Sequence, residues 1–75
     1  MTTPLDHILI FKTNILTAAD RLAIENRLNT HCGIERWSLD QQDVDCVLRI
    51  VSATLTPADI IDLITCQGFA CAELD

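Results

Sequence analysis

Hydrophobic and polar residues alternate along the chain with two different periods, which predict four strands and two helices. Apolar and β-branched runs of strand length cover residues 7–12, 34–39, 46–51 and 69–74. Residues 17–31 and 57–67 instead show the wider spacing of a helix with one apolar face. The predicted order is therefore strand, helix, strand, strand, helix, strand.

Both predicted helices begin with residues that cap helix starts. Thr17 with Asp20 three residues later resembles a capping box, and Thr56 is a second N-cap followed directly by proline. Gly33 and Gly68 are the predicted helix ends. The residues expected to face the core are Leu22, Ile24, Leu28 and Cys32 on the first helix and Ile60, Ile61, Leu63 and Ile64 on the second.

This order of elements predicts the α+β class and a ferredoxin-like βαββαβ fold. Right-handed crossovers place the first and third strands at the centre of a four-stranded antiparallel sheet, with two helices on one face. The other face of the sheet is then uncovered. A chain of 75 residues supports one hydrophobic core, so residues 1–75 are predicted to form a single domain.

The charge balance argues against polyanionic partners. The formal net charge is −6 at pH 7, and the five basic residues are scattered along the sequence. Nucleic acids and anionic membrane surfaces require clustered Lys and Arg, so neither is an expected partner. No apolar run reaches the length of a membrane span, and the first residues lack the pattern of a secretory signal. We therefore expect a cytoplasmic, reducing location with the four cysteines as free thiols.

Two segments resemble the heavy-metal-associated domain family. Residues 33–40 (GIERWSLD) are similar to the G-V-x-x-V-x-V-D segment that leads into the hairpin of that family, and residues 57–69 resemble its second helix and closing G-F pair. In order and spacing, the resemblance covers essentially the whole chain. It implies the ferredoxin-like fold. For typical members it also implies binding of Cu(I) or Zn(II) by a C-x-x-C motif between the first strand and the first helix.

The chain departs from this family at the metal motif itself. The two cysteine positions fall on Thr17 and Asp20, and the preceding methionine position falls on Ile15. A hydroxyl and a carboxylate do not replace two thiolates for soft Cu(I), whereas both side chains suit a helix cap. By the family motif, the sequence therefore predicts no metal cofactor.

Three of the four cysteines offer an alternative metal or redox site. The predicted topology places Cys46, Cys66 and Cys71 toward the end of the domain where the family holds its metal. A Cu(I) or Zn(II) site on these relocated thiols is therefore the alternative function. Strand alternation instead points Cys46 and Cys71 into the core as small apolar side chains and leaves Cys66 as the exposed thiol. The residues alone leave both interpretations open.

No enzymatic constellation accompanies these cysteines. The chain has no serine with a plausible histidine partner, no glycine-rich phosphate loop and no pair of carboxylates in an apolar surround. No enzymatic activity is therefore predicted.

The uncovered sheet face carries the main functional prediction. Several apolar side chains of the first, third and fourth strands should point there, and exposed apolar patches of this kind mark interaction surfaces. The candidate interface residues are Ile8, Ile10, Val47, Val51, Ala70 and Ala72. We therefore expect a protein-interaction or self-association module that forms a homo-oligomer or binds a protein partner through this face.

Overall fold

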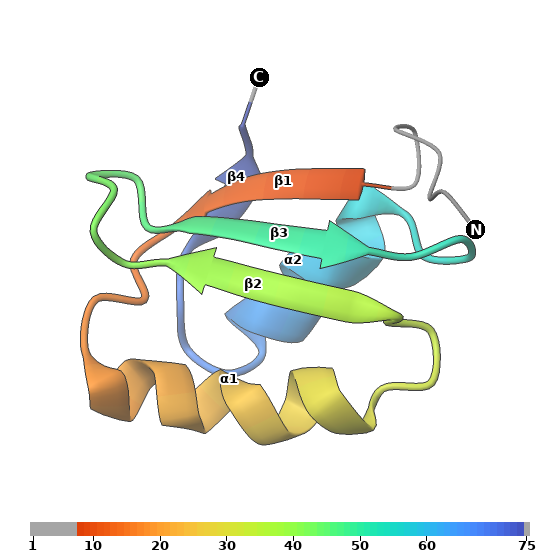
Figure 1. The fold of residues 1–75 in the computed structure, drawn as a ribbon, viewed down its shortest axis with the longest axis horizontal. Helices are drawn as coiled ribbons and strands as arrows, with labels where there is room; N and C mark the ends of the chain where they lie inside the picture. Colours follow the sequence, from red (N-terminus) through yellow and green to blue (C-terminus); the bar gives the residue numbers. More distant parts are fainter. Residues whose placement is uncertain (1–7, 75) are drawn as a thin grey trace.

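The computed structural model describes residues 8–74, which form the predicted four strands and two helices in the predicted order (Figure 1). The elements are β1 (Ile8–Thr13), α1 (Ala18–Thr30), β2 (Arg36–Asp40), β3 (Val47–Val51), α2 (Pro57–Thr65) and β4 (Cys71–Glu73). Their ends differ from the predicted ones by no more than two residues. His7, predicted as the first residue of the first strand, lies outside the described residues.

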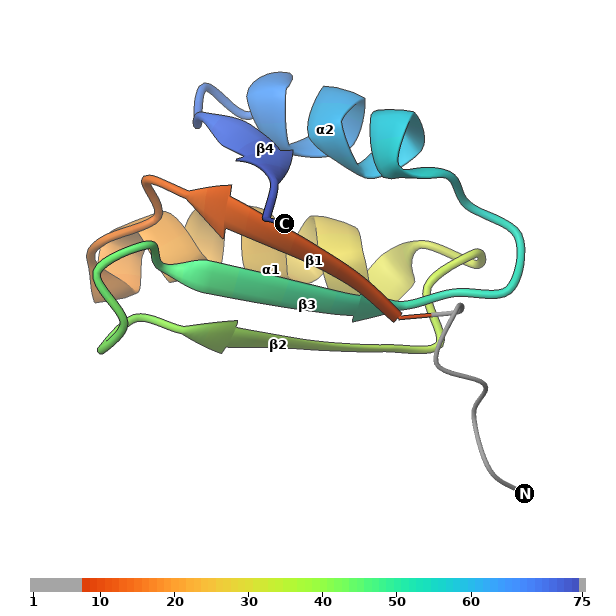
Figure 2. The same ribbon diagram turned by 90° about the horizontal axis from the view of Figure 1, so that it is seen from above.

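The strands form one antiparallel sheet in the order β2-β3-β1-β4. Strands β1 and β3 occupy the centre, as right-handed crossovers predict, and both helices lie on the same side of the sheet (Figure 2). The ferredoxin-like βαββαβ prediction is therefore confirmed. Within residues 8–74, the other face of the sheet carries no helix. Neither of the two described helices is long and apolar enough to cross a membrane.

The hydrophobic core lies between the sheet and the two helices. Strand alternation points Phe11, Leu48 and Ile50 toward the helices, and each of these side chains is fully buried. Trp37 and Leu39 of β2 pack against the edge of this core. The buried cluster consists of Phe11, Ile15, Ile24, Leu28, Leu48, Ile50, Ile60 and Ile64.

The apolar face of α1 is narrower than predicted. Ile24 and Leu28 are buried, but Leu22 is 67% exposed and Cys32 is also exposed. Leu22 and Ile24 are two residues apart, so a helical period of 3.6 residues directs them to nearly opposite sides. Cys32 lies beyond the helix end at Thr30, where the helical period no longer applies. The predicted core positions of Leu22 and Cys32 are therefore wrong.

The two predicted helix-ending glycines differ in conformation. Gly68 follows the last turn of α2 with a φ of +91°, the left-handed conformation that glycine adopts without strain. In contrast, α1 ends at Thr30 with His31 as an extended C-cap, so Gly33 does not end this helix. A Cβ atom at Gly33 would lie 3.0 Å from Leu55 Cγ. A larger residue at position 33 would therefore crowd the Leu55 side chain, which packs closely against the chain before β2.

Candidate functional site

The loop between β1 and α1 is held together by Thr17 and Asp20. The Asp20 N–H donates to Thr17 Oγ1 at 3.0 Å, and the Thr17 N–H donates to Asp20 Oδ2 at 3.1 Å. The Leu16 N–H donates to the same carboxylate oxygen at 3.2 Å. These contacts form a complete capping box, so both side chains are engaged in starting α1, as the sequence predicts.

Two further side chains close this loop from the sheet side. The Gln41 amide, in the turn between β2 and β3, donates to the carbonyl oxygens of Thr17 at 2.8 Å and Ile15 at 3.3 Å. The Thr13 hydroxyl donates to the Cys46 carbonyl at 2.8 Å and accepts the Ile15 N–H at 3.2 Å. Because Ile15 is fully buried, the loop is anchored by its apolar side chain as well as by its hydrogen bonds.

The residues of this loop do not fit Cu(I). Soft Cu(I) prefers thiolates, and the corresponding positions hold a hydroxyl and a carboxylate that are already hydrogen bonded to the backbone. The methionine position holds Ile15, which belongs to the core. Among residues 8–74, no three His, Cys, Asp or Glu side chains are grouped closely enough to hold a metal ion. In this fold, Thr17 and Asp20 of the loop cap the start of α1.

The stability of the fold should depend on pH through two capping boxes, that of Thr17 with Asp20 and that of Thr56 with Asp59 at the start of α2. Backbone N–H groups of Thr17 and Thr56 hold the pKa values of Asp20 and Asp59 below the ordinary value of 3.8. Because the folded pKa is lowered, each carboxylate stabilises the fold above its unfolded pKa, and this contribution is lost as pH falls through the folded pKa. We expect Asp59→Asn to lower the melting temperature at neutral pH and to have little effect in strong acid, as measured by circular dichroism.

Asp62→Asn is the matched control for this measurement. It removes one exposed carboxylate from the same helix, outside the capping box. It should change the melting temperature less than Asp59→Asn does at neutral pH. An equal loss for Asp59→Asn at neutral and acidic pH would contradict a role for the ionised carboxylate.

The structure does not gather the three candidate cysteines into one site. The Cys46 carbonyl accepts the Thr13 hydroxyl, and Cys71 pairs with Thr13 in the sheet, so these two cysteines lie at the predicted end of the domain. Cys46 is buried, whereas Cys66 is exposed at the C-cap of α2. Burial raises the pKa of the half-buried Cys71 to about 11, so its thiol stays protonated at neutral pH. A protonated thiol is a poor metal ligand and a poor nucleophile.

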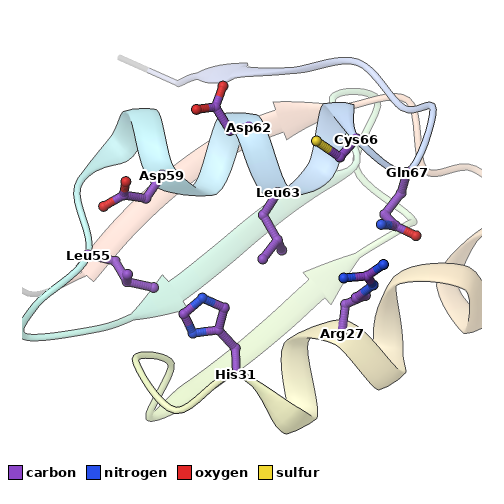
Figure 3. Close-up of a pocket in the computed structure, with 8 residues that line it drawn as sticks. All are labelled: Arg27, His31, Leu55, Asp59, Asp62, Leu63, Cys66 and Gln67. Carbon is purple, nitrogen blue, oxygen red and sulfur yellow. The ribbon is translucent and has the colours of Figure 1, made fainter.

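A groove of about 520 Å³ runs between the two helices (Figure 3). Its lining consists of Arg27, His31, Leu55, Asp59, Asp62, Leu63, Cys66 and Gln67. Arg27 and His31 point from α1 toward α2. Two polar groups are already engaged, because His31 Nδ1 accepts the Gly33 N–H at 3.0 Å and Asp59 Oδ2 accepts the Thr56 N–H at 2.9 Å. The groove is therefore lined by charged groups of both signs and by one thiol. The His31 ring and the Asp59 carboxylate already accept backbone hydrogen bonds within the fold.

The uncovered sheet face presents most of the predicted interface residues to solvent. Ile10 is 38% exposed, and this is high for a large apolar side chain on a central strand. Val47 is the exception, because it is only 3% exposed and offers almost no area to a partner. Of the other four, Ala70 and Ala72 are exposed, and Ile8 and Val51 are half-buried.

A hollow of about 280 Å³ extends this face at the hairpin end. It lies where the first and fourth strands meet the turn between β2 and β3. Val44, at the tip of that turn, is 92% exposed. The lining residues are Lys12, Thr13, Asn14, Val44, Asp45, Ala70, Cys71 and Ala72. Sequence patterns missed Val44 as a surface residue of interest because it stands alone in a polar turn.

Comparison with known proteins finds a solved structure with the same fold. No family model matches the chain, and no curated protein matches its sequence. The copper transporter domain Ccc2A of yeast, solved in solution in apo and Cu(I)-loaded states, has the same fold with a TM-score of 0.76. The match covers 91% of this chain and 94% of the yeast domain at 18% sequence identity. The chain therefore has the fold of this copper transporter domain, and the loop between β1 and α1 carries a helix cap.

Proposed function

We propose that this domain is a non-enzymatic protein-interaction module that keeps the fold of a copper-transport domain without a Cu(I) site in its first loop. The capping box of Thr17 and Asp20 carries this proposal. Both side chains are hydrogen bonded to the start of α1, and neither offers the thiolate that soft Cu(I) prefers. The domain thus retains the scaffold on which the yeast neighbour is loaded with Cu(I), while the corresponding positions serve folding.

The state of the cysteines supports the same proposal. All four are free thiols, and free thiols are typical of a reducing location such as the cytoplasm. Burial of Cys46 and the raised pKa of Cys71 disfavour a shared thiolate site with Cys66. We infer that these two cysteines act as small apolar side chains near the sheet.

The uncovered sheet face supports an interaction role. A large apolar side chain, Ile10, is partly exposed on this face, together with the half-buried Ile8 and Val51 and the exposed Ala72 of β4. Burying such a surface against a partner protein or a second copy of the chain removes apolar area from water. A small domain gains from this, because its own core supplies only roughly 3–5 kcal/mol of stability.

A competition titration of the reduced protein with Cu(I) and Zn(II), against a chelator of known affinity, tests the proposal. We expect the chelator to retain both metals, because residues 8–74 hold no group of three potential ligands that includes these thiols. Cys66→Ser should then behave as the wild type does. Stoichiometric metal binding by the wild type that Cys66→Ser abolishes would contradict the proposal and favour a relocated thiol site.

A further inference from the structure

The basic residues, scattered in the sequence, are concentrated in space. Three of the five, Lys12, Arg36 and Arg49, lie on the uncovered sheet face, and all three are exposed. The other two, Arg21 and Arg27, lie on α1. The chain as a whole has a net charge of −6. An acidic protein therefore presents one basic surface.

The sheet register arranges these three cations as a diagonal stripe. Arg36 of β2 is opposite Val51 of β3, which is two residues from Arg49. Arg49 is opposite Ile10 of β1, which is two residues from Lys12. Diagonal neighbours of this kind in a sheet are about 7–8 Å apart. The stripe thus crosses three strands with an almost even spacing of positive charge.

Apolar side chains lie beside the stripe on the side of β4. Lys12 is opposite the exposed Ala72, and the Leu74 N–H donates to the Ile10 carbonyl at 3.0 Å. On the other side, Asp40 in β2 is the one acidic residue of the three sheet strands β1, β2 and β3. The face therefore combines a cationic stripe with two exposed apolar side chains, Ile10 of β1 and Ala72 of β4.

This arrangement disfavours a symmetric dimer through the face. In a two-fold dimer the same patch meets itself, so the cationic stripes of two copies would be brought together. Like charges brought together in an interface repel one another and weaken the association. A second copy of the chain in that arrangement is therefore a poor occupant of this surface.

Single-stranded nucleic acid is a poor occupant for another reason. Proteins that bind single strands on a sheet stack the bases on exposed aromatic side chains. Among the described strands, Phe11 and Trp37 are the aromatic residues, and both pack against the core on the helix side. The stripe can attract phosphates, but the described strands of this face hold no ring on which a base could stack.

We propose that the uncovered sheet face binds an extended acidic segment of a partner protein, with carboxylates at alternate positions along the segment. This inference rests on the proposed function as an interaction module and adds the chemistry of the partner. Alternate residues of an extended chain are about 6.4–6.8 Å apart, close to the spacing of the three cations. Consecutive Asp or Glu side chains at that spacing would meet Arg36, Arg49 and Lys12 in turn.

Titration with a synthetic peptide of repeated Glu-Thr dipeptides tests this surface. We expect the peptide to shift the backbone amide resonances of Ile10, Arg49 and Val51 in the ¹⁵N-labelled full chain, with an affinity that falls as salt is added. A Gln-Thr peptide of equal length should not shift them. Arg49→Glu should weaken binding about tenfold or more, because it breaks the stripe at its centre. Lys12→Glu is the second variant, in case the first alters the fold.

Arg27→Glu is the charge-matched control. It changes the net charge of the chain by the same amount on α1, away from the sheet. It should weaken peptide binding by less than about twofold, because distant exposed charges are screened by salt. Equal weakening by Arg27→Glu and Arg49→Glu would overturn the proposal, as would equal binding of the glutamine peptide.

Two further outcomes separate this inference from the proposed function. Tighter binding of a single-stranded oligonucleotide than of the Glu-Thr peptide at the same resonances would overturn the acidic-segment proposal. A protein that binds neither Cu(I) nor the peptide would lose this inference and keep the proposed function. Thiol-dependent Cu(I) binding would remove the proposed function, whatever the peptide does.

Discussion

Replacing Thr17 and Asp20 together with cysteine should create one tight Cu(I) site that the natural chain does not have. The two positions are three residues apart at the start of α1, where the sequence resemblance to the heavy-metal-associated family implies its two cysteines. Thiols at a helix N-terminus have lowered pKa values, and two thiolates at this spacing converge on one soft ion. Competition with a chromogenic Cu(I) chelator should show one bound Cu(I) per double variant and none for the wild type.

The control for this gain is Thr17→Ala combined with Asp20→Ala. It removes the same capping box, and each cap of this type contributes about 1 kcal/mol to helix stability. Both double variants should therefore lose similar stability, and the cysteine variant alone should gain metal binding. A folded cysteine variant that leaves all Cu(I) with the chelator would show that this loop lacks the geometry of a metal loop even when it carries the right ligands.

Leu28→Ala should unfold most of the protein, whereas Leu22→Ala should leave it nearly unchanged. Leu28 is 1% exposed and Leu22 is 67% exposed on the same helix, so the two substitutions differ only in burial. Truncating a fully buried leucine costs about 2–5 kcal/mol, comparable to the roughly 3–5 kcal/mol that a domain of this size has in total. Urea denaturation followed by circular dichroism measures both effects.

Leu22→Ala tests whether the buried face of α1 excludes Leu22, as the structure indicates. An exposed substitution is expected to change the free energy of unfolding by no more than about 0.5 kcal/mol. A loss for Leu22→Ala as large as that for Leu28→Ala would mean that α1 buries the broader face predicted from the sequence. A small loss for both would mean that α1 contributes little to the core.

Local chemistry in the sequence was enough to predict the helix starts. Thr17 with Asp20 and Thr56 with Asp59 are capping boxes because the interacting groups are three residues apart, and such contacts need no distant partner. The predicted order of strands and helices also led to the correct sheet order, because crossovers in such folds have one preferred hand. Which side chains stand at the start of the first helix could be read from the sequence for the same reason, since Thr17 and Asp20 are three residues apart.

Positions that depend on distant neighbours were predicted less well. The amphipathic pattern of the first helix predicts Leu22 in the core, but Leu22 is two residues from the buried Ile24 and lies on the exposed side of α1. The sequence predicts Gly33 as a helix end, whereas α1 ends before it and the Leu55 side chain, from the loop after β3, packs closely against Gly33. Val47 is predicted to be exposed on the uncovered face, but it is only 3% exposed, at the start of the central strand β3.

The sequence by itself determined the βαββαβ order and the two helix caps, because each depends on short-range pattern or residue identity. Only the tertiary structure decided which basic residues lie close together on one face of the sheet. Lys12, Arg36 and Arg49 are far apart along the chain, and the register of β1, β2 and β3 brings them into one stripe. A net charge counts residues without placing them, so an acidic chain can carry a basic binding face that composition alone conceals.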